Sequence, residues 1–302
     1  MNKFGRVAVL MGGIAAEREV SLRSGRAVCD ALIRAGVQAK AFDVTSLGQL
    51  VELSQQYDRA FIALHGRWGE DGQVQAILQS LKMPFTGSGM AASALAMDKL
   101  RTKWLWRGAG LSTPDFVQVT KTQPLDAATF NLPFPVIVKP CHEGSSIGMR
   151  KVNDMEALQQ AVEYAQQYDN EVLIERWVTG REFTVGVLNG KVLPTIELKT
   201  THDFYDYDAK YKANDTQYIC PCELTPALQK QIDELVLRGF EAIGASGWGR
   251  MDLLVDANNQ AWLIELNTVP GMTDHSLVPK AAKVAGISFE DLVVQILRTS
   301  LR

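Results

Sequence analysis

The order of apolar and polar positions in the first third of the chain predicts alternating strands and helices. Apolar runs at 6–13, 37–44 and 59–66 are typical of buried strands, and the first run ends in a glycine turn. Residues 21–36 and 73–81 have apolar positions at helical spacing instead. This alternation predicts a small, mostly parallel sheet with helices on its faces. Ligands bind such sheets beyond the carboxyl ends of the strands, where "GGIAAERE" and "HGRWGEDG" lie.

The middle of the chain predicts a second, smaller α+β unit. Its expected helices are 91–107 and 153–168, and its expected strands are 113–119, 133–140 and 171–178. The second of these helices begins at a polar capping residue and has its apolar residues on one stripe.

The last part of the chain changes to a pattern of β-hairpins. Residues 181–198 predict two strands around an Asn-Gly turn, and residues 249–267 predict a second hairpin. Helices are expected at 225–244 and near 288–300. The polar, tyrosine-rich segment 200–219 is too long for a simple connection, so we expect it to have a function of its own.

The second hairpin has acidic and amide side chains in otherwise apolar strands. Glu265 and Asn267 lie two positions apart, so their side chains share one face, and Asp252 is expected opposite them on the preceding strand. A buried carboxylate needs a compensating cation. Carboxylate and amide oxygens suit Mg²⁺ that also binds phosphate oxygens. The residues therefore leave two alternatives, a magnesium–nucleotide site or a salt bridge with Arg250.

A glycine–serine loop at 142–149 is the best candidate for a phosphate site. The sequence lacks the P-loop signature, but this loop offers small residues, backbone N–H groups and two hydroxyls, although it could also be a plain flexible turn. Lys139 lies in an apolar strand just before it and needs an anion such as phosphate. Lys99 is either a second phosphate ligand or a solvated helix charge. Glu175, in another apolar strand, either binds a nucleotide or pairs with a cation.

Composition narrows the classes of partner. The 302 residues are 46% hydrophobic and 22% charged, as in a globular protein with a full core. A net charge of −3 without long charged runs argues against nucleic acid or a membrane surface as a partner. No apolar run reaches the length of a membrane span, and the N-terminus is interpreted as a first strand rather than a signal peptide. The four cysteines, two of them in "CPC" at 220–222, are expected to be reduced thiols of a cytoplasmic protein rather than metal ligands.

Eight blocks follow one another along the chain: "MGGIAAEREVSLRSG", "ALHGRWGEDG", "MDKLRTK", "VIVKPCHEGSSIGM", "VLIERWVTGREFTV", "FYDYDAKY", "GRMDLLVD" and "LIELNTVPGMTDHSLVP". In this order they resemble the D-alanine–D-alanine ligase family of the ATP-grasp superfamily, and the resemblance covers nearly the whole chain. It implies a mixed α/β and α+β fold. A parallel α/β domain at 1–96 would precede two ATP-grasp units at 97–179 and 180–302 that enclose ATP, the second with a mobile loop at 200–219.

The resemblance implies a nucleotide site between the two ATP-grasp units. Its ATP-binding residues would be Lys99, Lys139, Ser146, Glu175, Arg176, Trp177, Val178, Glu182 and Lys210. The two lysines at 99 and 139 would contact phosphates, residues 175–178 would hold adenine, and Glu182 would contact the ribose. Many relatives have a lysine where this chain has Arg176. Two Mg²⁺ ions, or Mn²⁺, would bind Asp252, Glu265 and Asn267.

The implied substrates are ATP and two D-alanines. Glu17 would hold the ammonium of the first D-alanine with His65 nearby, and Ser145 and Tyr211 would hydrogen bond to Glu17 and close the long loop. The carboxylate of the second D-alanine would be received by Lys210, Ser276 and Leu277. From the residues alone, His65 could equally be a structural histidine and Ser276 a helix cap.

The implied reaction forms D-alanyl-D-alanine through a D-alanyl phosphate, with Arg250 and the backbone N–H of Gly271 stabilising the oxyanion of the second step. Tyr211 favours an amine as the second substrate, and the alternative is a related ligase that uses D-lactate. The family also implies synthesis of a peptidoglycan precursor by a cytoplasmic homodimer.

Overall fold

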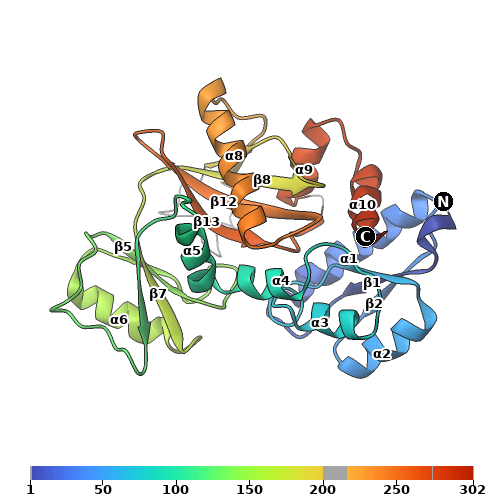
Figure 1. Cartoon of the computed structure of the whole chain (residues 1–302), viewed down its shortest axis with the longest axis horizontal. Helices are drawn as coiled ribbons and strands as arrows, with labels where there is room; N and C mark the ends of the chain where they lie inside the picture. The colour runs from blue at the N-terminus through green and yellow to red at the C-terminus, as the bar shows by residue number, and fades with distance from the viewer. Residues whose placement is uncertain (1, 200–215, 274, 302) are drawn as a thin grey trace.

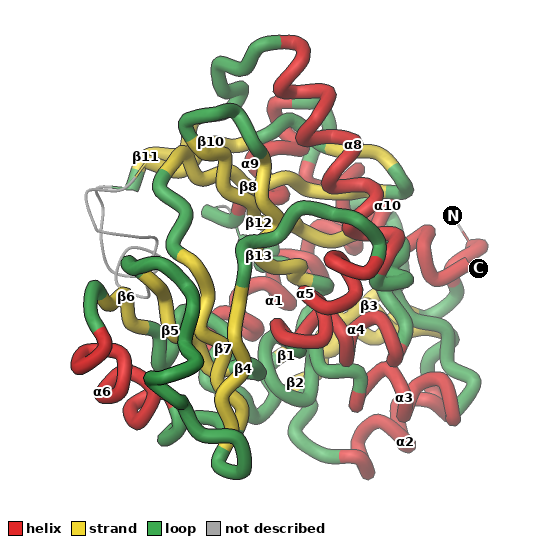
Figure 2. Tube along the Cα trace, turned by 60° about the vertical axis from the view of Figure 1, so that its left-hand side comes forward, coloured by secondary structure: helices red, strands yellow, loops and turns green. Residues whose placement is uncertain are grey.

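The computed structural model of the chain describes residues 2–199, 216–273 and 275–301. These residues form three sheets with helices packed around them, and the two termini lie near each other (Figure 1). The tube view separates the sheets more clearly, with the sheet of residues 116–176 in front of the other two (Figure 2).

The N-terminal sheet is parallel, as predicted, with strand order β2-β1-β3. Its strands are β1 (Val7–Met11), β2 (Ala39–Asp43) and β3 (Arg59–Ile62), and its helices are η1 (Asn2–Phe4), α1 (Arg18–Arg34), α2 (Leu47–Gln56) and α3 (Gln73–Ser80). Helix α2 was not predicted. Its start is fixed by Ser46, whose hydroxyl accepts a hydrogen bond from the backbone N–H of Gln49 while the Gln49 side chain returns to the start of the helix.

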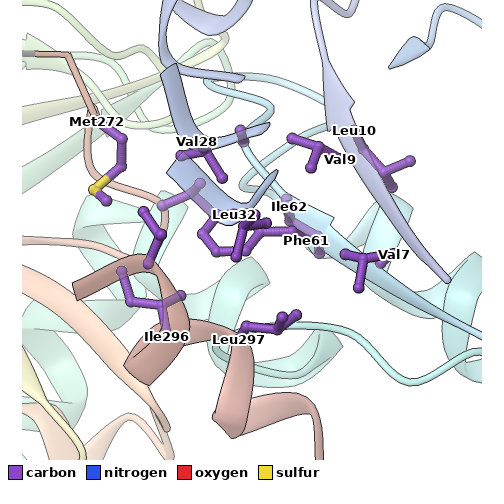
Figure 3. Close-up of a cluster of buried hydrophobic side chains, with 14 of the residues drawn as sticks. Val7, Val9, Leu10, Val28, Leu32, Phe61, Ile62, Met272, Ile296 and Leu297 are labelled. Carbon is purple, nitrogen blue, oxygen red and sulfur yellow. The ribbon is translucent and has the colours of Figure 1, made fainter. Parts of the chain in front are cut away.

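The core of this N-terminal unit takes residues from both ends of the chain (Figure 3). The last elements are α9 (Leu277–Val284), α10 (Phe289–Arg298) and η2 (Thr299–Leu301). Ile296 and Leu297 of α10 are fully buried in one apolar cluster with Val28, Leu32 and Phe61. The segment just after β13 also contacts α1, since the backbone N–H of Met272 donates to the hydroxyl of Ser24 at 3.1 Å.

The helix expected at 91–107 is in fact two helices, so that prediction was wrong. Helices α4 (Met90–Met97) and α5 (Lys99–Gly108) meet at Asp98, which has extended backbone angles. The Asp98 carboxylate accepts a hydrogen bond from the backbone N–H of Arg101 at 3.0 Å and so caps α5. This break places Lys99 in the first turn of α5.

The central sheet is antiparallel, with strand order β4-β7-β5-β6. Its elements are β4 (Phe116–Thr120), β5 (Val136–Pro140), β6 (Arg150–Val152), β7 (Glu171–Arg176) and the covering helix α6 (Met155–Ala165). The apolar stripe predicted for α6 is buried against this sheet. The sheet therefore has one face covered by α6 and leaves its other face toward the rest of the molecule (Figure 2).

The C-terminal sheet contains both predicted hairpins. Its elements are β8 (Gly180–Leu188), β9 (Lys191–Val192), β10 (Ile196–Lys199), β11 (Gln217–Ile219), β12 (Trp248–Asp256), β13 (Ala261–Asn267) and the covering helix α8 (Pro226–Ala242). Asn189 and Gly190 both have positive φ, as the predicted Asn-Gly turn requires. The second strand expected in the first hairpin is interrupted at residues 193–195, where Pro194 has no N–H to donate to a ladder.

Within the described ranges 2–199, 216–273 and 275–301, no helix has both the length and the apolar character needed to cross a bilayer.

Candidate active site

Two adjoining cavities lie where the three sheets meet. One, of about 500 Å³, is lined by the segments that follow β1 and β3 and by the segment after β13; we call it the N-terminal cavity. The other, of about 610 Å³, lies between the central and C-terminal sheets; we call it the central cavity. Lys99, Ser145 and Glu265 line both, so a molecule in one cavity can contact a molecule in the other.

The cavities gather the predicted site residues that the structure describes. The N-terminal cavity is lined by Glu17, His65, Lys99, Ser145, Arg250, Glu265, Asn267, Gly271, Ser276 and Leu277. The central cavity is lined by Lys99, Lys139, Ser145, Ser146, Glu175, Arg176, Trp177, Val178, Glu182, Asp252 and Glu265. Lys210 and Tyr211 lie outside the described residues.

Strands β12 and β13 bring the predicted metal ligands together. Asp252 pairs with Glu265 across the two strands and Arg250 pairs with Asn267, so Asp252 lies opposite these two residues as expected; the register shifts by one residue after Asp252. Arg250 binds Asp252 with two hydrogen bonds, of 2.9 and 2.8 Å, so the salt bridge considered as the alternative is present. The amide nitrogen of Asn267 donates to Asp252 at 3.2 Å. Since that nitrogen points at Asp252, the amide oxygen points the other way and is available as a hard ligand.

Glu175 lies between two lysines in the wall of the central cavity. Its carboxylate is 2.6 Å from Nζ of Lys103 and 3.0 Å from Nζ of Lys139, and all three side chains are buried. Burial alone would raise the pKa of Glu175, but the two ammonium groups outweigh it and leave that pKa lowered. The ion pair considered as an alternative for Glu175 is therefore present, and Lys139 has a carboxylate partner.

Lys103 had no predicted role. Its side chain is 1% exposed, and Nζ also donates to the hydroxyl of Thr113 at 2.5 Å. Burial lowers the pKa of Lys103 to about 8. Lys103 lies three residues from both Leu100 and Trp106, so it is on the apolar stripe of α5. A lysine among apolar positions is the feature of the sequence that could have marked it as a buried, paired residue.

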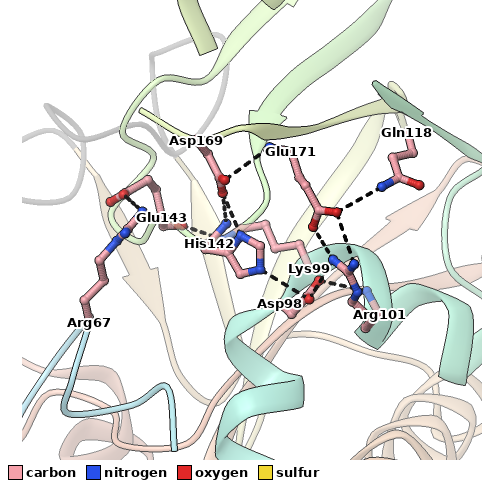
Figure 4. A network of polar contacts seen from close by, with 9 residues as sticks. All are labelled: Arg67, Asp98, Lys99, Arg101, Gln118, His142, Glu143, Asp169 and Glu171. Atoms are coloured by element: carbon pink, nitrogen blue, oxygen red, sulfur yellow. Dashed lines mark hydrogen bonds and ion pairs between the residues drawn. The ribbon is translucent and has the colours of Figure 1, made fainter. Parts of the chain in front are cut away.

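Lys99 and the loop at 141–149 are linked directly (Figure 4). Nζ of Lys99 donates to the backbone oxygen of Glu143 at 2.5 Å and lies 3.9 Å from Glu265. The Lys99 side chain is 11% exposed, which rules out a solvated helix charge. Arg67, in the segment after β3, binds the Glu143 carboxylate at 2.5 Å. The loop thus connects the central sheet to the N-terminal unit.

Glu17 and the loop meet in the N-terminal cavity. The hydroxyl of Ser145 donates to Glu17 at 3.2 Å. Gly144 is so close that a Cβ there would lie 2.6 Å from the same carboxylate, which explains a glycine at this position. Both Ser145 and Ser146 have positive φ, a backbone conformation that turns successive N–H groups into a concave arrangement suited to anions.

His65 is a buried, fully hydrogen-bonded histidine at the edge of the N-terminal cavity. Its Nδ1 lies 2.9 Å from the backbone oxygen of Val269 and its Nε2 lies 3.2 Å from the hydroxyl of Ser24. Burial lowers the pKa of His65 to about 4, so the ring is neutral at physiological pH. It fixes the segment after β13 against the N-terminal unit.

Glu70, in the same cavity, was not predicted as a site residue. Its carboxylate accepts hydrogen bonds from the backbone N–H groups of Gly66 at 2.7 Å and Val269 at 3.2 Å. Burial raises the pKa of Glu70 to about 7, and the nearby Glu17 adds to the effect while Arg250 opposes it. An acid in a glycine-rich loop gives no periodic signal in sequence, so only its place in "GEDG" could have suggested it.

Ser276 and Leu277 lie at the start of α9. Ser276 occupies the N-cap position, but its hydroxyl accepts from the backbone N–H of Thr273 at 3.0 Å and makes no capping bond to α9. A Cβ at Gly271 would lie 2.9 Å from that hydroxyl. Gly271 and Ser276 therefore lie close together at the edge of the cavity.

The fold and the site define an ATP-grasp enzyme, with two α+β units enclosing a cavity that is lined by lysines, a glycine–serine loop and acids on paired strands. Residues 105–298 match the family model described as "D-ala D-ala ligase C-terminus", and residues 41–88 match "D-ala D-ala ligase N-terminus". The chain therefore belongs to the D-alanine–D-alanine ligase family.

Relatives and solved structures agree with this assignment. A D-alanine–D-alanine ligase of Hydrogenovibrio crunogenus is 65% identical over 301 residues, covering 100% of this chain and 96% of the relative. The ligase of Ectopseudomonas mendocina is 56% identical, covering 99% and 95%. The solved ligase of Bacillus anthracis complexed with ATP has a TM-score of 0.89 at 33% identity, covering 99% and 98%. The VanG D-Ala:D-Ser ligase of Enterococcus faecalis has a TM-score of 0.88 at 27% identity, covering 99% and 100%.

Proposed function

We propose that the chain joins two D-alanines to D-alanyl-D-alanine and converts ATP to ADP and phosphate. The observation that carries this proposal is that the two cavities meet at Lys99, Ser145 and Glu265. A nucleotide in the central cavity would present its terminal phosphate at that junction to a carboxylate in the N-terminal cavity. The names of the full-length relatives support the same reaction. The division into domains 1–96, 97–179 and 180–302 is part of this proposal.

The central cavity would hold ATP, and the solved relative with bound ATP supports this. Lys99 and Lys139 supply positive charge for the phosphates, and the Ser145–Ser146 turn supplies N–H groups. The adenine and ribose would lie against Glu175, Arg176, Trp177, Val178 and Glu182. The pairing of Glu175 with Lys139 favours an additional task for this acid, which is to hold the lysine extended along the cavity wall.

Asp252, Glu265 and Asn267 fit a magnesium site because they offer only hard oxygen donors on neighbouring strands, with the Asn267 amide already oriented by Asp252. They would hold two Mg²⁺ or Mn²⁺ ions. Bound there, the metal supplies charge neutralisation for the phosphates. Arg250 binds the Asp252 carboxylate through two hydrogen bonds and so orients it.

The chemistry then requires positioning rather than a covalent enzyme intermediate. The carboxylate of the first D-alanine attacks the γ-phosphorus of ATP, the bond to ADP breaks, and D-alanyl phosphate forms. The amine of the second D-alanine attacks the acyl carbon, and phosphate leaves. Arg250 and the backbone N–H of Gly271 line the N-terminal cavity where the oxyanion of this step would form.

The amino acids would occupy the N-terminal cavity. Glu17, held by Ser145, would bind the ammonium of the first D-alanine beside His65. Ser276, Leu277 and Lys210 would bind the carboxylate of the second. Lys210 and Tyr211 enter this proposal from the sequence alone. The names of the relatives support an amine rather than D-lactate as the second substrate.

We place the enzyme in the cytoplasm, as a homodimer that supplies a peptidoglycan precursor. The four cysteines form no disulfide with one another in the structure, as is common for proteins of a reducing compartment.

A direct test measures ADP release and detects the dipeptide by mass spectrometry with ATP, Mg²⁺ and D-alanine. L-alanine in place of D-alanine is the control, and D-lactate and D-serine are offered as second substrates. We expect D-alanyl-D-alanine as the main product and no turnover with the Glu265→Gln variant, which should remain folded by circular dichroism. ATP hydrolysis indifferent to D-alanine would overturn the proposal.

A further inference from the structure

His142 opens the loop 141–149 and lies among charged groups from three separate elements (Figure 4). Its Nδ1 is 2.7 Å from the carboxylate of Asp169, which follows α6, and its Nε2 is 3.2 Å from the carboxylate of Asp98 at the start of α5. The backbone N–H of His142 donates to the same Asp169 carboxylate at 2.8 Å. Arg101 on α5 and Glu171 on β7 complete the charged surroundings.

Both ring nitrogens of His142 face acceptors, so both must carry a proton to donate. Only the imidazolium can do this. The hydrogen bonds to Asp169 and Asp98 raise the pKa of His142 to about 9. Burial would raise the pKa of Asp169, but the bond from His142 outweighs it and lowers that pKa to about 2. At neutral pH the group is an imidazolium between two carboxylates.

A metal ion is a poor alternative occupant of this cluster. Ligand atoms of Asp98, His142 and Glu171 lie within 4.8 Å of one another, as in some metal sites. The guanidinium of Arg101, however, binds both carboxylates, with Asp98 at 3.0 Å and a short contact to Glu171. Since the protein already supplies two cations here, the cluster is a network of ion pairs.

This network is connected to the reacting groups through Lys99. Asp98 immediately precedes Lys99, and Nζ of Lys99 returns to the backbone oxygen of Glu143, the neighbour of His142. His142, Asp98, Lys99 and Glu143 therefore form a closed ring of contacts. The ring ties the beginning of α5 to the beginning of the loop whose next residues, 144–146, line the cavities.

We propose that His142 is a positioning residue that holds Lys99 and the loop at 144–146 in one arrangement for the phosphates of ATP. This inference rests on the proposed function and goes beyond it, because His142 itself lines neither cavity. Loss of the second ring proton would leave a lone pair of the imidazole facing a carboxylate, which opens the ring at Asp98 or at Asp169. Binding of ATP should therefore weaken as the pH rises through the pKa of His142.

The experiment compares the full-length wild type with His142→Gln and His142→Arg between about pH 7 and pH 10. Gln keeps one donor at most, whereas the Arg guanidinium donates to two carboxylates and stays charged throughout this range. The His142 side chain is 36% exposed, which leaves room for the longer residue. Asp115→Asn is the matched control, because it breaks the exposed ion pair between Arg107 of α5 and Asp115, which precedes β4, away from the loop.

At pH 7.5 we expect His142→Gln to raise KM for ATP about tenfold, the factor that one hydrogen bond between charged groups supports. Asp115→Asn should leave KM for ATP unchanged. The ratio of kcat/KM for ATP between wild type and His142→Arg should fall above about pH 9. This ratio isolates His142, since the two proteins share every other titrating group, Lys103 and the substrate amine included.

The outcomes separate this inference from the proposed function. If the wild type forms no dipeptide, the proposed function fails before any variant is needed. A merely structural role would lower the melting temperature and the active fraction of His142→Gln but leave its KM for ATP at the wild-type value, and that result would overturn the inference. A ratio of wild type to His142→Arg that stays level across the pH range would overturn it as well, whatever the stability of the Gln variant.

Discussion

Glu175 in the wall of the central cavity lies between two ammonium groups, whereas Glu70 in the N-terminal cavity is held by two backbone N–H groups. Both carboxylates are withdrawn from bulk water. The two cations keep the pKa of Glu175 lowered despite its burial, while burial raises the pKa of Glu70 to about 7. Neighbouring cavities thus contain one acid with a lowered pKa and one whose pKa is raised to about 7.

The difference follows from what each cavity is built to receive. Two lysines around one glutamate leave a surplus positive charge beside the central cavity, which suits the phosphates of a nucleotide. In the N-terminal cavity, Glu17 and Glu70 lie close enough to influence each other, which suits a ligand with an ammonium group. In the central cavity, the charge of Glu175 is balanced by lysines of the folded chain. In the N-terminal cavity, the acids would be balanced by the ammonium group of a bound substrate.

Removing a cation from Glu175 should have the largest effect. We expect Lys103→Met to lower the free energy of unfolding by about 3–5 kcal/mol, because it leaves a buried carboxylate with one partner instead of two. Urea unfolding measures this. Lys103→Met combined with Glu175→Gln should recover part of the loss, and Lys230→Met, at an exposed lysine, should change stability by less than about 0.5 kcal/mol. Equal losses in the single and double variants would contradict the role given to charge.

Replacing Glu70 should affect catalysis more than folding. We expect Glu70→Gln to lower kcat/KM for D-alanine by about 10- to 100-fold at pH 8, since an ionised group beside the substrate contributes about 1.4–3 kcal/mol. The wild type should lose activity as the pH falls through about 7, where Glu70 becomes protonated, and the variant should not show this change. His65, with a pKa of about 4, stays neutral over this range. Initial rates of ADP release from about pH 6 to pH 9 provide the measurement.

Glu52→Gln, at an exposed acid of α2, is the matched control and should keep the wild-type pH profile. If the Glu70→Gln variant still lost activity as the pH fell through about 7, another group would be responsible. The raised pKa of Glu70 would then have no role in catalysis.

The contrast also shows which parts of the site the sequence could predict. Lys139 and Glu175 stand out as charges in apolar strands. The hairpin places Asp252 in the region opposite Glu265 and Asn267, but the exact pairing of Asp252 with Glu265 depends on a shift in register after Asp252 that the sequence does not predict. The third member of the lysine–glutamate cluster, Lys103, comes from a helix, where a single lysine is ambiguous until its neighbours are known to be buried.

Other features depend on tertiary contacts that no local pattern encodes. The alternation of strand-type and helix-type apolar spacing predicted the parallel N-terminal sheet, but it did not predict the break between α4 and α5. Apolar residues continue through it, and only the capping bond from Arg101 to Asp98 reveals it. Glu70 likewise owes its raised pKa to burial in the folded chain, where one of its hydrogen bonds comes from Val269, about two hundred residues away in sequence.

A smaller effect concerns stability and pH. The folded-state pKa of Glu70, about 7, lies above its ordinary value of 4.5, so the stability that Glu70 contributes is fully present below pH 4.5 and is lost as the pH rises to about 7. The loss is about 3–4 kcal/mol by the conversion of one pKa unit to about 1.4 kcal/mol. The glutamine of the Glu70→Gln variant has no proton to lose, so the melting temperature of this variant should rise relative to that of the wild type between pH 5 and pH 8. A constant difference would show that Glu70 is ionised throughout.

The smallest effect is expected where an acid pairs with a cation in water. Glu290 of α10 accepts a hydrogen bond from Arg34 of α1 at 2.8 Å, and the two side chains are 38% and 58% exposed. Glu290→Gln should cost less than about 1 kcal/mol, because exposed pairs gain little from each other and lose side-chain freedom. The difference from wild type in urea unfolding should shrink further in about 0.5 M salt, where exposed charges are screened. The pair has the same chemistry as Lys103 and Glu175 and differs from it in burial. If Glu290→Gln lowered the free energy of unfolding as much as Lys103→Met, burial of the ion pair would not be what makes it important for stability.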